Sequence, residues 1–168
     1  MPEPIDHVRK RGAIESVLRR IPGFRGYLEK EYRREADDLQ RDWLADRLQR
    51  SKRGLDDLTG TLANAGQIDL LPQCDRLRGR LDKLIGRIRG AMQGYSGFFD
   101  LVQVDEALLD RVYRHDVGIM DRVEELAEEV ERLPRVESPE EAVARLTQRV
   151  SELDDAWNQR VDMLKGLE

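Results

Sequence analysis

Residues 74–91 read CDRLRGRLDKLIGRIRGA, and the apolar side chains in this stretch recur at alternating steps of three and four residues. The apolar positions are Cys74, Leu77, Leu81, Leu84, Ile88 and Ala91. This spacing places them on one narrow face of an α-helix, which is the a/d pattern of coiled coils and helix bundles. We therefore predict a helix over residues 70–93 whose apolar seam is buried against neighbouring helices.

Similar spacing predicts three more long helices, over residues 27–64, 104–133 and 139–167, and a short basic amphipathic helix over residues 1–22. Ser138 and Glu141 match the N-cap and third position of a capping box before the last helix. No alternating strand pattern of useful length occurs. The prediction is a single all-α domain over residues 1–168. We expect an elongated antiparallel four-helix bundle, or a coiled-coil-like assembly, with a short extra N-terminal helix.

The apolar stripe of the segment 27–64 changes register near its middle. One run contains Leu28, Tyr32, Ala36, Leu39 and Trp43, and a second run begins one place later at Leu44. We interpret this shift as a rotation of the buried face. Because this helix would be much longer than the helix over 70–93, part of it would overhang and would need cover from the first helix or from a second chain.

A tight corner is predicted before this helix, in the stretch IPGFRGY at residues 21–27. Gly23 can close the first helix in a left-handed conformation, and Gly26 lets the chain turn again. The apolar residues that would fold onto the corner are Ile21, Phe24 and Tyr27. A similar stretch, GYSGFF at residues 94–99, predicts a second corner of the same kind.

The same region supplies a candidate contact surface, because a protein partner would recognise exposed aromatic side chains beside arginines. The candidate residues are Phe24, Arg25, Tyr27, Tyr32, Arg33, Arg34 and Trp43. We expect a protein partner, or a second copy of the chain as a homo-oligomer, at this surface. A nucleic-acid partner is not expected, because the net charge is −5.

Residues 21–37, IPGFRGYLEKEYRREAD, resemble the N-terminal signature of an uncharacterised group of bacterial helical-bundle proteins. In that group an IPG-aromatic-x-GY segment precedes a charged run, and the matching pattern in this chain is IPGFxGYxxKExRRExD. The resemblance implies a helical-bundle fold. It implies no activity, so it bears on the architecture alone.

The first helix combines an apolar strip with positive charge. Its residues of interest are Arg9, Lys10, Arg11, Ile14, Val17, Leu18, Arg19, Arg20 and Ile21. An anionic membrane surface would attract such a helix. The C-terminal third offers a nearer partner, since residues 100–168 hold 9 Lys/Arg against 19 Asp/Glu, whereas residues 1–54 hold 14 against 10. We therefore expect docking on the bundle, with membrane contact as the alternative.

Residue types suited to catalysis or metal binding do not form a recognisable set. His7 and His115 are the only histidines, and no acidic residue stands three places before His115, as a di-iron bundle would require. Cys74 is the only cysteine, which excludes an internal disulfide, and its seam position predicts a buried apolar residue. We expect no enzymatic activity, no cofactor, no metal and no small-molecule substrate.

Two further features interrupt the apolar patterns. His115 and Asp116 stand where the seam of their helix should hold an apolar residue. We interpret them as a polar layer that fixes helix register, with a proton-transfer site as the alternative. Gly86, Gly90 and Gly94 lie four residues apart along one helix side. We interpret them as room for the close approach of a neighbouring helix, with a hinge as the alternative.

The composition favours a soluble chain of long solvated helices, with 38% charged and 5% aromatic residues. No apolar stretch approaches the roughly 18 residues needed to span a bilayer, and the N-terminus lacks the layout of a secretion signal. We expect a cytoplasmic, non-enzymatic scaffold or protein-interaction module that self-associates. The alternative is a peripheral membrane module anchored by its first helix.

Overall fold

The computed structural model describes residues 4–90 and 105–165, with side chains from residue 12 onward. Within these ranges the chain is helical and contains no β-strand, which confirms the all-α prediction. The helices are α1 (Pro4–Arg20), α2 (Lys30–Asn64), α3 (Leu71–Gly90), α5 (Glu106–Arg132) and α6 (Pro139–Lys165). Short 3-10 turns, η1 (Ile68–Leu70) and η2 (Leu133–Arg135), precede α3 and follow α5.

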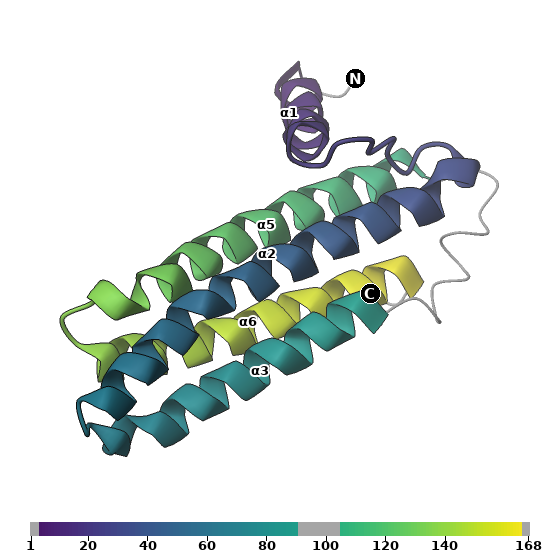
Figure 1. Cartoon of the computed structure of the whole chain (residues 1–168). Helices are drawn as coiled ribbons and strands as arrows, with labels where there is room; N and C mark the ends of the chain where they lie inside the picture. The colour runs from purple at the N-terminus through teal and green to yellow at the C-terminus, as the bar shows by residue number, and fades with distance from the viewer. Residues whose placement is uncertain (1–3, 91–104, 166–168) are drawn as a thin grey trace.

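α2 and α3 form one antiparallel hairpin, and α5 and α6 form a second (Figure 1). Ion pairs between α2 and α3 give their relative direction, because Lys52 pairs with Asp82 whereas the later residue Asp56 pairs with the earlier residue Arg78. α5 and α6 also run in opposite directions. Consecutive long helices in the described ranges therefore run antiparallel in each hairpin, as predicted.

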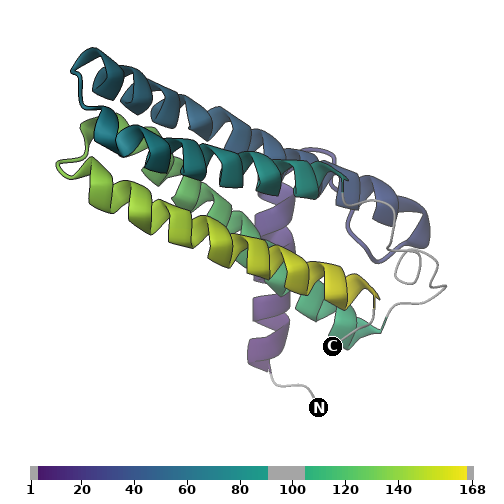
Figure 2. The same ribbon diagram turned by 90° about the horizontal axis from the view of Figure 1, so that it is seen from below.

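The two hairpins lie side by side, so that α2 packs on α5 and α3 packs on α6 (Figure 2). These lateral neighbours run in the same direction. Arg80 of α3 contacts Ser151 of α6, and Arg87, later in α3, contacts Asn158, later in α6. The prediction that neighbouring helices are antiparallel is therefore wrong for these two pairs. The reason is that α2 and α5 both start at the corner end and pack against each other.

One hydrophobic cluster runs through the described helices. The predicted seam of α3 is confirmed, because its described residues are at most 1% exposed: Cys74, Leu77, Leu81, Leu84 and Ile88. Burial of each leucine side chain contributes about 1.5–3 kcal/mol. The last predicted seam residue, Ala91, lies outside the described residues.

The closest helix contact recorded at a glycine lies at Gly54 of α2, where an added Cβ would stand 2.2 Å from the Val130 carbonyl oxygen of α5. Gly86 and Gly90 are exposed and have open space around the Cβ position. The interpretation that these two glycines admit a neighbouring helix is therefore wrong. Gly94 lies outside the described residues.

α1 crosses the long helices steeply and packs on α5 (Figures 1 and 2). Val17 and Ile21 are buried there, and Arg20 forms an ion pair with Asp121 of α5. The predicted docking of α1 on the other helices is therefore present. Ile14 is half-buried, whereas Leu18 is 47% exposed. The side chains of the predicted cations Arg9, Lys10 and Arg11 lie outside the described residues.

The corner after α1 forms as predicted. Gly23 and Gly26 adopt left-handed backbone angles, with φ of 82° and 85°, which glycine adopts without the strain that a side chain would cause. Phe24 and Tyr27 are buried beneath these turns. The similar stretch at residues 94–99 lies outside the described residues.

Candidate functional site

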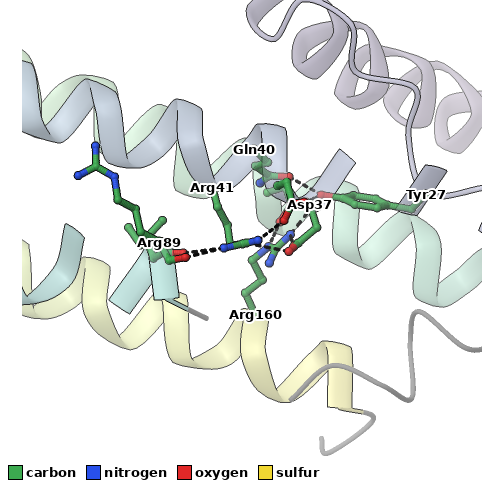
Figure 3. Close-up of polar contacts among 9 residues, drawn as sticks. Tyr27, Asp37, Gln40, Arg41, Arg89 and Arg160 are labelled. Carbon is green, nitrogen blue, oxygen red and sulfur yellow. Dashed lines mark hydrogen bonds and ion pairs between the residues drawn. The ribbon is translucent and has the colours of Figure 1, made fainter. Parts of the chain in front are cut away.

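A cluster of buried polar side chains lies near the corner, where α2, α5 and α6 meet (Figure 3). We call it the buried polar cluster, and its members are Tyr27, Asp37, Gln40, Arg41, Asp116 and Arg160. An unpaired charge in this environment would cost several kcal/mol. The cluster contains two aspartates and two arginines, so each charge has a counter-charge nearby.

On α2 the cluster continues the leucine face toward the N-terminus of the helix. Asp37 and Arg41 precede the buried residues Leu44 and Leu48 at steps of four, three and four. The buried face of α2 therefore keeps its register through Trp43, and the predicted rotation is wrong. The sequence pattern was misleading because charged residues fill the buried positions while apolar side chains such as Trp43 are only half-buried.

Arg160 of α6 lies at the centre of the cluster. Its Nε donates to Asp116 Oδ1 at 2.8 Å, and its Nη2 donates to Asp37 Oδ1 at 2.7 Å. Burial alone would lower the pKa of Arg160, but Asp116 and Asp37 together raise that pKa well above its ordinary value. Arg160 is therefore charged and joins α2, α5 and α6 through one side chain.

Tyr27 enters the cluster from the corner. Its hydroxyl contacts Gln40 Oε1, lies 3.0 Å from Asp116 Oδ2 and accepts a hydrogen bond from Arg160 Nη2 at 3.2 Å. The single hydroxyl hydrogen can be donated to only one of the two acceptors at a time. Burial, and then the charge of Asp116, raise the pKa of Tyr27 well above its ordinary value. Tyr27 is therefore a neutral donor.

Arg41 connects the cluster to the end of α3. Its Nε donates to Asp37 Oδ2, and its Nη1 donates to the Arg89 carbonyl oxygen, both at 2.8 Å. That carbonyl belongs to the last turn of α3, where intrahelical donors are no longer available. The contact thus satisfies an acceptor at the end of α3 and fixes that end against α2.

His115 and Asp116 have different surroundings. The half-buried His115 ring places Nε2 2.8 Å from the Ala156 carbonyl oxygen, whereas Asp116 is fully buried in the cluster. The pair thus forms polar contacts between α5 and α6, and its role in helix register remains a prediction. Among the described side chains, residues 12–90 and 105–165, no three His, Cys, Asp or Glu residues are grouped to hold a metal ion.

The described surface contains two hollows along α6, and no cluster residue lines either of them. One lies between α5 and α6 and includes Arg122, Glu125 and Asp155. The other lies between α3 and α6 and includes Lys83 and Asp154. The cluster residues are at most 4% exposed and their charges face one another, so the geometry of the cluster is that of a clamp between helices.

Three residues of the predicted contact surface lie inside the protein. Phe24 and Tyr27 pack in the corner, and the buried Arg33 donates from Nε to the Tyr27 carbonyl oxygen at 2.7 Å. Their assignment to an exposed surface is therefore corrected, because the corner folds onto α5 and α2. Of the remaining four residues, Arg25 and Arg34 are exposed, and Tyr32 and Trp43 are half-buried. Partner binding at these four stays a prediction.

Sequence reasoning found Asp116 at a seam position, and the spacing of Asp37 and Arg41 predicts the ion pair that they form, but the burial of four cluster members was missed: Asp37, Gln40, Arg41 and Arg160. A usable signal was present at Arg160, which stands between the seam residues Trp157 and Leu164 at steps of three and four. A charged residue at a seam position indicates either an interrupted seam or a buried ion pair. Only the position of the neighbouring helices separates these two cases.

In comparisons with known proteins, the chain matches no protein-family model, no curated protein and no solved structure. The resemblance of residues 21–37 to a bacterial helical group therefore remains an expectation. None of the described helices has both the length and the apolar character needed to cross a membrane.

Proposed function

We propose that the chain is a non-enzymatic helical scaffold that acts through protein-protein contacts and associates with itself. In this proposal α2, α3, α5 and α6 constitute an elongated four-helix bundle, and α1 is carried on its outside. The observation that carries the proposal is the buried polar cluster. Its ionisable groups, Asp37, Asp116 and Arg160, bind one another across three helices, which suits a rigid framework better than a reaction centre.

The division of charge over the chain supports contact between copies. Within one chain Arg47 of α2 already binds Glu124 and Glu131 of α5. Further exposed carboxylates stand on the α5–α6 hairpin and further exposed cations on the α2–α3 hairpin: Glu125, Glu140, Glu141, Arg50, Arg53 and Arg76. Opposite charges on the two hairpins attract between chains as they do within one.

Light scattering on the full chain tests self-association. We expect the apparent mass to rise above the monomer value of 19.5 kDa with concentration. The increase in mass should become smaller with added salt, because at 0.1 M salt the attraction between exposed charges more than about 10 Å apart is largely screened. A mass that stays at the monomer value across micromolar concentrations would reject the proposal.

The peripheral membrane alternative is supported by the exposed Leu18 beside the exposed Arg19 on α1. It would require α1 to leave α5, because Val17 and Ile21 are buried in the present arrangement. Sedimentation with anionic vesicles separates the two functions. The scaffold proposal predicts no co-sedimentation, whereas salt-sensitive binding that is lost on deletion of residues 1–20 would favour the membrane function.

A further inference from the structure

The N-terminal arm, which we define as α1 with the corner up to residue 27, is held by a small number of side chains. Val17 and Ile21 supply apolar contact, and Arg20 pairs with Asp121 of α5. At the end of the arm, the Tyr27 backbone N–H donates to the Tyr113 hydroxyl at 2.8 Å. Phe24 and Tyr27 of the arm are also buried, and the Tyr27 hydroxyl reaches the buried polar cluster. Separating the arm therefore opens that cluster at Tyr27 and leaves the apolar seams of the two hairpins in place.

The position that receives Tyr27, which we call the seat, includes four described side chains of the two hairpins. Its polar groups come from Gln40 of α2, Asp116 of α5 and Arg160 of α6, and its aromatic wall is Tyr113, whose ring centre lies 5.3 Å from that of Tyr27. Among the described residues, Gln40 Nε2 and Arg160 Nη1 are buried and make no hydrogen bond. The seat thus recognises a phenol group, and any chain carrying the same arm supplies one.

The connection between arm and α2, which we call the hinge, is tied to α2 by one side chain: Arg33 donates from Nε to the Tyr27 carbonyl oxygen at 2.7 Å and from Nη2 to the Leu28 carbonyl oxygen at 3.2 Å. Leu28 is 67% exposed, and Glu29 at the N-cap of α2 has extended backbone angles and makes no side-chain capping hydrogen bond. The apolar spacing predicts that the helix begins at residue 27, yet α2 begins at Lys30. Winding of residues 28 and 29 into α2 would direct the arm away from its own seat.

We propose that the arm exchanges between two copies of the chain, so that Tyr27 of each copy occupies the seat of the other. This inference rests on the proposed self-association and names the surface that mediates it. The contacts between arm and seat are the same in the closed monomer and in the exchanged dimer. Protein concentration and the hinge therefore determine which form predominates.

Cross-linking between two differently tagged full-length chains tests the exchange. One chain carries Arg20→Cys and the other carries Asp121→Cys, because these partly exposed residues are paired between arm and α5. After co-incubation at a dimer-forming concentration, a short bismaleimide should join the two chains. The wild-type chain, whose single cysteine Cys74 is buried, is the blank.

A matched control uses an ion pair that lies wholly within the hairpins. Arg47 of α2 and Glu131 of α5 are paired in a similar way, but neither belongs to the arm. A mixture of Arg47→Cys and Glu131→Cys chains should therefore give no product between chains. A cross-linked product between chains that forms only in the mixture of Arg20→Cys and Asp121→Cys supports exchange. Products in both mixtures would overturn it, because they would indicate general contact between faces.

The hinge provides a second readout that does not depend on cysteine chemistry. Deletion of Leu28 and Glu29 should shift the monomer–dimer equilibrium to dimer, because a short connection prevents the arm from reaching its own seat. Insertion of Gly-Ser after Leu28 should shift it to monomer. Dimers that form without arm cross-links and without response to the hinge would overturn exchange while self-association stands. A monomer at every concentration would overturn both.

Discussion

The two ends of the hairpins are held together by different means. At the corner end, Arg160 binds two carboxylates from two other helices. At the far end the core is apolar, with Leu55 and Leu77 fully buried and no buried charge among the described residues of that end. A leucine seam repeats, so apolar packing alone distinguishes weakly between registers, whereas an ion cluster fits one arrangement. We infer that the far end contributes strength and the corner end contributes register.

The largest effect is expected from Arg160→Met, which keeps an apolar stem and removes the guanidinium. Asp116 would then be buried without its counter-charge, whereas Asp37 would keep its pair with Arg41. The unpaired charge should lower the free energy of unfolding by about 3–5 kcal/mol. Urea unfolding measures the loss. The matched control is the double variant Asp116→Asn and Arg160→Met, whose loss should be smaller because Asp37 still pairs with Arg41 and no unpaired charge remains. If Arg160→Met lowers the free energy of unfolding by less than an ordinary surface substitution does, the cluster does not act as a clamp between the helices.

Gly54→Ala examines the far end and should have the next largest effect. The added Cβ would lie 2.2 Å from the Val130 carbonyl oxygen and 2.6 Å from Glu131 Cα, and backbone atoms cannot move aside easily. We expect a loss of about 1–3 kcal/mol in thermal unfolding. Gly60→Ala on the same helix is the control, since nothing lies within 4 Å of its Cβ position. That variant should gain up to about 1 kcal/mol from helix propensity.

Alkaline pH should weaken the corner end first. Burial raises the pKa of Tyr27 and of Tyr113, so the folded chain keeps phenol protons that the unfolded chain loses above about pH 10. Stability is therefore complete below about pH 10 and falls as the pH rises beyond it. Tyr27→Phe should cost about 1–2 kcal/mol at neutral pH and should reduce this fall. Urea unfolding at a series of alkaline pH values measures how fast stability falls with pH. An equal fall for the wild type and Tyr27→Phe would contradict the assignment of this loss to Tyr27.

The smallest effect is expected at the exposed pair Arg89 and Asp46, whose side chains are 45% and 63% exposed. Arg89→Ala should change the free energy of unfolding by less than about 0.5 kcal/mol, because solvent screens this pair. The Arg89 backbone carbonyl still accepts from Arg41 in this variant. Arg41→Met is the comparison, and its greater loss in the same urea assay would show that the buried contact matters more than the exposed one.

Local patterns predicted the helices well and their mutual placement poorly. The seam of α3 follows from residue spacing alone, and the start of α6 at Pro139 follows from Ser138, whose carbonyl accepts the Ala142 N–H. The parallel packing of α2 on α5 depends on contacts between segments far apart in sequence. The same reason explains the glycines, because the backbone of α5 lies opposite Gly54 whereas nothing lies within 4 Å of the Cβ position of Gly86.

The candidate site was the least predictable part of the molecule. Asp116 was noticed because it interrupts a seam, but nothing local indicates that its partners are Arg160 and Tyr27. The exposed apolar residue Leu28, which precedes α2, suggested a buried face different from the one that Asp37, Gln40 and Arg41 occupy. A buried ion pair can be recognised from the sequence only when it is known which residues of the two helices lie opposite each other.

The shared guanidinium of Arg160 has a consequence for how this protein can change over generations. In the trio Asp37, Asp116 and Arg160, Asp116 pairs with Arg160 alone among the described residues, whereas Asp37 also pairs with Arg41. Losing Arg160 by itself therefore leaves an intermediate that folds poorly. Descendants of a common ancestor should therefore retain Asp116 and Arg160 together or replace both, while single leucines in the seams drift freely among apolar residues of similar volume.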